Sequence, residues 1–246
     1  MKKDFLFDGT YEGLLSVLYY IVNRKEQINK IAITYLYQEN FIVEKEYVDT
    51  DIRNSKKVYY LLKRKLSNDS IKNSYYAFLS EDDGIYTKIY SYYMQGLKYG
   101  KKLDLFLTNE DVYEIQKVSK KVSNEIHRYL GILRFKELEN DYLYAKIKPD
   151  NNILTVLAKH FKSRLPQYNW IIHDENRKIA VIYNKAEWII SEFDLEFNYK
   201  IPKEEYHYQN LWKQYFNNVS IKSRENKKLQ KKYIPTRYWK HLVEFF

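Results

Sequence analysis

The spacing of apolar residues changes near Asp141, and this change constrains the fold more than any other feature of the sequence. Up to residue 140, apolar residues recur mainly at every third or fourth position, a spacing typical of amphipathic helices. Residues 142–149 and 168–184 instead alternate or form short apolar runs, which is typical of β-strands. We therefore predict the α+β class: mostly helical, with a small mixed or antiparallel sheet formed around residues 141–195.

The same change indicates how the chain is organised. We predict a mainly helical N-terminal lobe over residues 1–140, and a second part over 141–246 that joins the small sheet to a basic helical segment. The 246 residues include only 6 glycines and 4 prolines and contain no Gly/Ser-rich linker. Because nothing in the sequence separates the two parts, we expect them to form one compact unit.

Side chains that accept hydrogen bonds from helix N-termini indicate where several helices begin. One long helix is expected from about residue 109 to 136, and another from Asp150 to the residue before Pro166. The first helix of the chain follows "DGTYEG" and is expected to bury Leu14, Leu18 and Val22 on its apolar face. The expected cap residues, in chain order, are Thr10, Thr50 or Asp51, Thr108 or Asn109, Asp150 and Ser223.

The absence of cysteine excludes several kinds of site. Without a thiol, this chain has no disulfide, no zinc–thiolate centre, no cysteine nucleophile and no ligand for an iron–sulfur cluster. No histidines lie at metal-site spacing with carboxylates around them, so we expect neither a metal nor another cofactor. We also expect no signal peptide and no membrane span, because no run of about 18 apolar residues occurs. These features fit a cytoplasmic protein.

Positive charge is concentrated at the C-terminal end of the chain. The formal net charge is +10, and residues 220–246 contain eight Lys and Arg residues against two Glu residues. Excess positive charge favours polyanionic partners, and aromatic rings among the cations can stack on bases or dock on the core. We predict DNA as the partner. The residues expected to bind nucleic acid are Lys222, Arg224, Asn226, Lys227, Lys228, Lys231, Lys232, Arg237, Tyr238 and Lys240.

The stretch "EIHRYLGILRF" (125–135) reads as the last turns of the long helix. His127, Gly131 and Arg134 follow the i, i+4, i+7 spacing that puts residues on one helix face. This face differs from the apolar stripe that contains Val122 and Ile126. This face is either exposed to solvent or packed against another helix, in which case Gly131 would allow close approach. Alternatively, it is part of a binding surface that includes Arg128.

The helix expected after Asp150 offers a companion to that face. His160 and Arg164 are spaced i, i+4 at the edge of the stripe formed by Leu157 and Phe161. A buried Arg164 would need a carboxylate, phosphate or carbonyl partner, because an unpaired buried charge is costly. We therefore weigh an internal ion pair with an interior histidine against a shared pocket for an anion or base. The pocket residues would be His127, Arg128, Gly131, Arg134, His160 and Arg164.

Five long stretches resemble one bacterial protein family. In chain order they are "DGTYEGLL", "EIHRYLGILRF", "YAKIKPDNNILTVLAKHFKSRL", "HDENRKIAVIYN" and "LWKQYFNNVSIKSRENKKLQKKYIPTRYWKHL". Together they are similar to the family of probable DNA metabolism proteins, whose biochemical activity is unknown. The resemblance covers essentially the whole chain.

The resemblance implies association with other proteins rather than a mechanism. Members of the family occur alone beside a radical S-adenosylmethionine (radical SAM) protein of DNA modification or repair, or fused N-terminal to a uracil-DNA glycosylase-like domain. It therefore implies a protein of either kind as a partner. No glycosylase part is expected in this sequence, and a radical cluster would have to belong to the partner. No catalytic residues carry over from the family, although the residues named above lie in its motif stretches.

The leading hypothesis is a nucleic-acid-binding accessory protein in DNA repair or modification that acts with a partner enzyme. One alternative is a metal-independent nucleic-acid-processing enzyme, with His127 or His160 as acid–base catalyst and arginines stabilising phosphate charge. Another alternative is a protein-interaction subunit that does not bind DNA itself.

Overall fold

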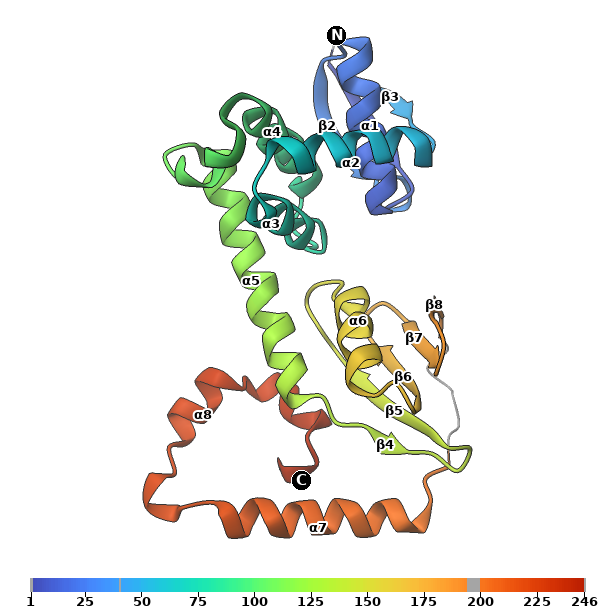
Figure 1. Ribbon diagram of the computed structural model, residues 1–246, viewed down its shortest axis with the longest axis vertical. Helices are drawn as coiled ribbons and strands as arrows, with labels where there is room; N and C mark the ends of the chain where they lie inside the picture. The colour runs from blue at the N-terminus through green and yellow to red at the C-terminus, as the bar shows by residue number, and fades with distance from the viewer. Residues whose placement is uncertain (1, 40, 194–199, 246) are drawn as a thin grey trace. The chain divides into compact units, whose positions relative to one another are not determined.

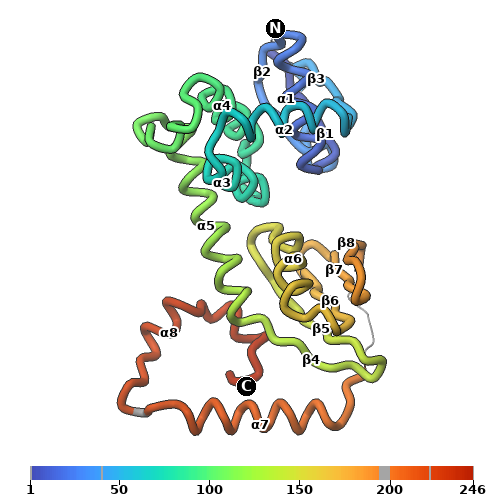
Figure 2. Tube along the Cα trace, viewed as in Figure 1, coloured from blue at the N-terminus to red at the C-terminus, as the bar shows by residue number. Residues whose placement is uncertain are grey.

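The computed structural model describes residues 2–39, 41–193 and 200–245 (Figures 1 and 2). The chain divides into two compact units, residues 1–123 (unit 1) and 124–246 (unit 2). The boundary falls inside helix α5 (Glu110–Ile132), whereas the sequence placed it between residues 140 and 141. Both units combine helices with a small sheet, and the predicted α+β class is confirmed.

Unit 1 begins with a three-stranded parallel sheet in the order β2-β1-β3. Its strands are β1 (Lys3–Phe7), β2 (Ile28–Ile33) and β3 (Glu44–Tyr47), and helix α1 (Tyr11–Arg24) connects the first two. A strand in the middle of a parallel sheet is covered on both faces, which explains the continuous apolar run of Phe5, Leu6 and Phe7. The expectation of a mainly helical lobe over residues 1–140 did not include this sheet.

The remaining elements of unit 1 are helical. They are the 3-10 turn η1 (Thr34–Leu36), α2 (Ile52–Lys65), α3 (Asn68–Phe78), α4 (Ile85–Tyr99), η2 (Gly100–Leu105) and the first part of α5. The caps Thr10, Asp51 and Asn109 are confirmed, since their side chains accept hydrogen bonds from Gly13 N, from Arg53 N and Asn54 N, and from Val112 N. The expectation for Val22 is wrong, because its side chain is 48% exposed.

Unit 2 contains a five-stranded mixed sheet in the order β4-β5-β6-β7-β8. Its strands are β4 (Lys136–Glu137), β5 (Tyr142–Ile147), β6 (Asn169–Asp174), β7 (Ile179–Asn184) and β8 (Trp188–Glu192). β5 and β6 are parallel and the other neighbours antiparallel. A parallel pair requires a crossover, which helix α6 (Leu154–Arg164) supplies. The predicted sheet is thus confirmed as mixed.

Helix α6 covers one face of this sheet (Figure 1). Trp170 and Ile172 alternate along β6 and are fully buried, and the Phe161 ring of α6 lies 6.5 Å from the Trp170 ring. Ile171, which lies between them, points to the opposite face and packs there with Tyr144. That opposite face is the one that contributes to the candidate functional site.

The C-terminal part of unit 2 consists of helices and 3-10 turns (Figure 2). They are α7 (Lys203–Val219), η3 (Lys222–Arg224), α8 (Lys227–Tyr233), η4 (Thr236–His241) and η5 (Val243–Phe245). The cap expected at Ser223 is wrong, because α8 begins later and Leu229 N donates to Asn226 Oδ1 at 2.9 Å. Asp150 does not cap α6 either, because Ile153 occupies that position and has no side-chain cap.

The described residues contain no helix with the length and low polarity that crossing a bilayer would need.

Candidate functional site

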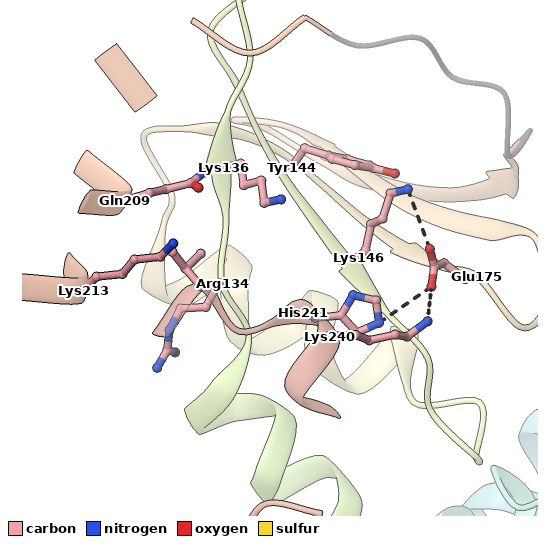
Figure 3. Close-up of a pocket in the computed structure, with 10 residues that line it drawn as sticks. Arg134, Lys136, Tyr144, Lys146, Glu175, Gln209, Lys213, Lys240 and His241 are labelled. Atoms are coloured by element: carbon pink, nitrogen blue, oxygen red, sulfur yellow. Dashed lines mark hydrogen bonds and ion pairs between the residues drawn. The ribbon is translucent and has the colours of Figure 1, made fainter. Parts of the chain in front are cut away.

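A basic pocket of about 390 Å³ lies in unit 2 (Figure 3). Five cationic side chains line it against a single carboxylate, Glu175. The lining residues come from the end of α5, two strands, the β6–β7 turn and the C-terminal segments. They are Arg134, Lys136, Tyr144, Lys146, Glu175, Gln209, Lys213, Lys240, His241 and Val243. We call this set the basic pocket.

The sheet contributes the floor of the basic pocket. Tyr144 and Lys146 are two residues apart on β5, so both side chains stand on the same face. Lys136 is directly opposite Tyr144 in the antiparallel β4–β5 ladder and therefore shares that face. Figure 3 shows the Lys136 ammonium directed into the pocket. Strand register thus brings two lysines beside one aromatic ring.

Helix α7 contributes one wall because a buried carboxylate attaches it to β4. Glu205 accepts a hydrogen bond from Glu137 N at 3.1 Å, which satisfies a backbone donor of the edge strand. Its other oxygen accepts from Gln209 Nε2 at 2.8 Å. Gln209 and Lys213 follow Glu205 at i+4 and i+8, so the helix places both on the attached side.

The C-terminal segment is attached to the body of unit 2 through Glu125. This carboxylate, 3% exposed, accepts hydrogen bonds from Asp150 N, from Asn151 N and Nδ2, and from the Tyr238 hydroxyl. The buried Tyr238 ring also meets the Tyr129 ring edge-on at 5.0 Å. These donors come from two segments far from Glu125 in the sequence, residues 150–151 and Tyr238 of η4, so this carboxylate fixes where η4 lies.

Docking of η4 places Lys240 and His241 beside Glu175 (Figure 3). The Glu175 carboxylate lies 3.0 Å from Lys240 Nζ, 3.6 Å from Lys146 Nζ and 3.6 Å from His241 Nε2. Burial opposes ionisation of Glu175, but the hydrogen bond and charge of Lys240 and the charges of His241 and Lys146 lower its pKa below the ordinary value. Glu175 is therefore an ionised internal partner for the cations around it.

His241 is neutral at physiological pH. Burial lowers its pKa to about 4, and the nearby charges of Lys240, Lys146 and Lys136 act in the same direction, against the opposing charge of Glu175. Its ring can therefore exchange hydrogen bonds in the basic pocket without adding to the positive charge.

Arg134 contributes mainly to the framework of the pocket. Its guanidinium donates to Gly131 O at 3.1 Å, at the end of α5, where a cation complements the helix dipole. It also forms a 2.8 Å ion pair with Glu244 and lies over the Trp212 ring. Trp212 Nε1 donates to the same Glu244 carboxylate at 3.1 Å. Glu244 thus compensates Arg134, and the uncompensated charge in the pocket belongs to lysines.

The pocket predicted around His127 and His160 is not assembled in this form. Both histidines are exposed, and of the six predicted residues only Arg134 lines the basic pocket. Arg164 is exposed rather than buried beside a partner, because a long side chain at the edge of an apolar stripe can extend into water. Gly131 is exposed with open space around its Cα, so close approach does not explain it. Arg128 is half-buried.

Some of the residues predicted to bind nucleic acid are exposed, whereas others are buried or contact other residues of unit 2. Five are exposed cations, namely Arg224, Lys227, Lys228, Lys231 and Lys232, whereas the Lys222 side chain lies outside the described residues. Asn226 is exposed and caps α8. The expectation for Tyr238 is corrected, because its ring is buried and unavailable for stacking. Arg237 is engaged by Asp150 and the Tyr238 hydroxyl, and Lys240 belongs to the basic pocket.

Sequence reasoning missed most of the basic pocket. The i, i+2 spacing of Tyr144 and Lys146 in the predicted strand could have indicated a shared face. No comparable signal joined Lys136, Glu175, Lys213 and His241, because strand register and helix docking bring them together. Within the part of the chain that the structure describes, no three His, Asp or Glu side chains are grouped so that they could hold a metal ion.

Comparison with known proteins identifies a family but not an activity. The model of the family described as a domain of unknown function, DUF4130, matches residues 83–244. That range includes every residue of the basic pocket. No curated protein matches the chain.

Proposed function

The chain belongs to the DUF4130 family, and from its basic pocket and exposed C-terminal cations we propose that it binds nucleic acid through phosphate groups. Unit 2 would provide the binding surface, since its residues include 22 Lys and Arg against 15 Asp and Glu. The proposal covers recognition of the polyanion and assigns no chemistry to the chain itself.

The convergence of lysines on one hollow carries the proposal. Lys136 and Lys213 have no acidic partner among the described residues, whereas Lys146 and Lys240 both contact Glu175. Like charges held together raise the energy of the empty site, and an anion relieves that repulsion. Phosphate groups are the anions that lysine clusters bind in nucleic acids.

Helix α8 supports the proposal independently. Lys228, Lys231 and Lys232 are exposed and follow the i, i+3, i+4 spacing of one helix face. Lys227 has only a 3.8 Å ion pair with the exposed Glu225, which contributes little in water. A row of solvated cations of this kind suits successive phosphodiesters of a strand.

The proposed setting is DNA repair or modification in the cytoplasm, as an accessory to a partner enzyme. It rests on the resemblance of the motif stretches to DNA metabolism proteins. A radical SAM protein or a uracil-DNA glycosylase-like protein is the partner that this resemblance implies.

The experiment is a salt series of oligonucleotide binding, measured by fluorescence anisotropy with single-stranded and duplex DNA. We expect the logarithm of the affinity to fall linearly with the logarithm of salt concentration, by about 0.7 to 0.9 per phosphate contact. Lys227→Ala/Lys228→Ala should weaken binding and reduce this slope.

Lys101→Ala/Lys102→Ala is the matched control, because it removes two adjacent exposed lysines from η2 of unit 1. This variant should bind like the wild type. An equal loss of affinity in both double variants would show that net charge alone attracts the oligonucleotide, which would contradict a specific surface on unit 2. No binding at low salt would refute the proposal.

A second candidate function has one specific observation in its favour. Tyr208, Leu211, Tyr215 and Val219 form a stripe along α7, and each side chain is between 46% and 60% exposed. Such a stripe is typical of a helix that docks on another protein. If the chain is a protein-interaction subunit, Tyr215→Glu should abolish co-purification with the partner enzyme, and the wild type should show no DNA affinity.

A further inference from the structure

The arrangement of charge in the basic pocket differs from that on α8. The lysines of α8 follow one another along a helix, whereas Lys136, Lys213, Lys146 and Lys240 come from separate segments and face a common hollow. A row of cations matches a continuous strand of phosphodiesters. A concave group of cations matches a single, more highly charged end group.

The charge in the pocket exceeds what one phosphodiester would compensate. Lys240 and Lys146 contact Glu175, and Arg134 is paired with Glu244. Lys136 and Lys213 also line the pocket, and neither has an acidic partner among the described residues. An internal phosphodiester has one negative charge, whereas a phosphate monoester has about 1.5 to 2 negative charges at pH 7 and three acceptor oxygens. Its extra charge and acceptors match the two lysines that lack an acidic partner, Lys136 and Lys213.

The pocket also offers surface for the nucleoside next to such a phosphate. Its volume of about 390 Å³ lies within the usual range of small-ligand sites. The Gln209 amide can both donate and accept hydrogen bonds, and the neutral His241 ring can do the same. Val243 adds apolar surface.

We propose that the basic pocket binds the terminal phosphate monoester of a nucleic-acid strand, with Lys136 and Lys213 as its principal ligands. This inference rests on the proposed function, because it names the part of the nucleic acid that the pocket recognises.

The test compares single-stranded oligonucleotides of one sequence with a 5′-phosphate, a 3′-phosphate or hydroxyls at both ends, labelled at an internal base. We expect a terminal phosphate at one end to increase the affinity of the wild-type chain at least tenfold. This change corresponds to about the free energy of one charge-assisted hydrogen bond. This comparison needs no variant, so it does not depend on whether a variant folds.

Two double variants separate the pocket from α8. Lys136→Ala/Lys213→Ala should remove the preference for the phosphorylated end, so that phosphorylated and hydroxyl-ended strands bind with the same affinity. Lys227→Ala/Lys228→Ala should weaken binding of both strands equally and leave their ratio intact. A preference that survives Lys136→Ala/Lys213→Ala in a folded protein would overturn the assignment of the site.

The outcomes distinguish the inference from the proposed function. Salt-dependent binding with no preference for a terminal phosphate would overturn the inference and leave the proposed function standing. No binding of any oligonucleotide would overturn both. Deoxyadenosine monophosphate is the probe for a free nucleotide, and competition as strong as that of the phosphorylated strand would overturn a strand-end site.

Discussion

A pocket beside α1 in unit 1 and the basic pocket of unit 2 differ more in charge than in size. The first, here called the pocket of unit 1, has a volume of about 480 Å³ and the basic pocket one of about 390 Å³. The pocket of unit 1 lies where the chain leaves β1 and β3, and it is lined by two carboxylates, Asp8 and Glu12, with one lysine, Lys56. The basic pocket instead has five cationic side chains and one carboxylate in its lining.

The difference shows why volume is a poor guide to function. Asp8 accepts hydrogen bonds from Thr10 N, from the Thr10 hydroxyl and from the Thr50 hydroxyl, so its carboxylate serves the turn before α1. The basic pocket leaves Lys136 and Lys213 without acidic partners among the described residues. A ligand is more strongly favoured where the protein has not already compensated its own charges.

The largest effect is expected when the carboxylate that assembles unit 2 is removed. Glu125→Ala would leave buried donors of Asn151 and Tyr238 unpaired, and we expect a loss of about 3–5 kcal/mol in the free energy of unfolding. Asp8→Ala in unit 1 should cost about 1 kcal/mol, because Asp8 is exposed and water can replace it. Urea denaturation of both variants measures the difference. Equal losses in the free energy of unfolding would contradict the expected larger role of Glu125.

The next effect tests the charge contrast between the pockets. Lys136→Glu/Lys213→Glu should weaken binding of the end-phosphorylated oligonucleotide by roughly 100-fold or about 2.7 kcal/mol, because two attractive contacts become repulsive. Lys56→Glu in the pocket of unit 1 should change affinity by less than about threefold, as expected of a remote surface charge under salt screening. Anisotropy titrations give both values. A similar loss from Lys56→Glu would remove the distinction between the pockets.

A smaller effect is expected from the pH dependence of unit 2. Because the pKa of His241 falls from an ordinary value of 6.5 to about 4 in the folded state, only the unfolded state takes up this proton as pH falls from 6.5 to 4. Stability should therefore be highest above pH 6.5 and decrease below it, by about 2 kcal/mol from this group. His241→Asn should remove that decrease in urea denaturation between pH 7 and 5.

His127→Asn is the control for this measurement, because His127 is an exposed histidine of the same unit. It should retain the wild-type pH dependence. If both histidine variants behave alike, the cations of the basic pocket do not act on His241 as described.

The smallest effect compares one helical glycine from each unit. Gly131→Ala should stabilise the protein by up to about 1 kcal/mol, because open space surrounds it and alanine favours helix. Gly13→Ala should destabilise it, because the new Cβ would collide with the Asp8 carboxylate and the Thr50 hydroxyl. Thermal denaturation measures both. A destabilised Gly131→Ala variant would restore a packing role for Gly131.

Much of the local structure could be predicted because it depends on neighbours in the sequence. Thr10 and Asn109 cap helices through hydrogen bonds to residues three positions away. The alternation of 142–147 follows from a strand with two unlike faces. Even so, Asn226 rather than Ser223 caps α8, because α8 begins at Lys227 and Ser223 lies in the preceding turn η3.

The candidate site was only partly predictable for the same reason. The charge excess of residues 220–246 indicated a polyanion, and Lys240 belongs both to that segment and to the basic pocket. His127 and His160 are exposed and do not line the basic pocket. Helix spacing shows which residues share a face but not what that face meets.

The sequence by itself therefore determined the elements, the absence of thiol chemistry and the excess of positive charge, because each depends on residue type or on spacing within one helix or strand. The tertiary structure decided which charges compensate one another. Tyr238 bonds to Glu125 across 113 residues and Arg237 to Asp150 across 87. Such pairs depend on how separate elements pack and on strand register, and no local spacing encodes them. Some cations are compensated by these ion pairs. Lys136 and Lys213 have no acidic partner among the described residues and are therefore available to a ligand.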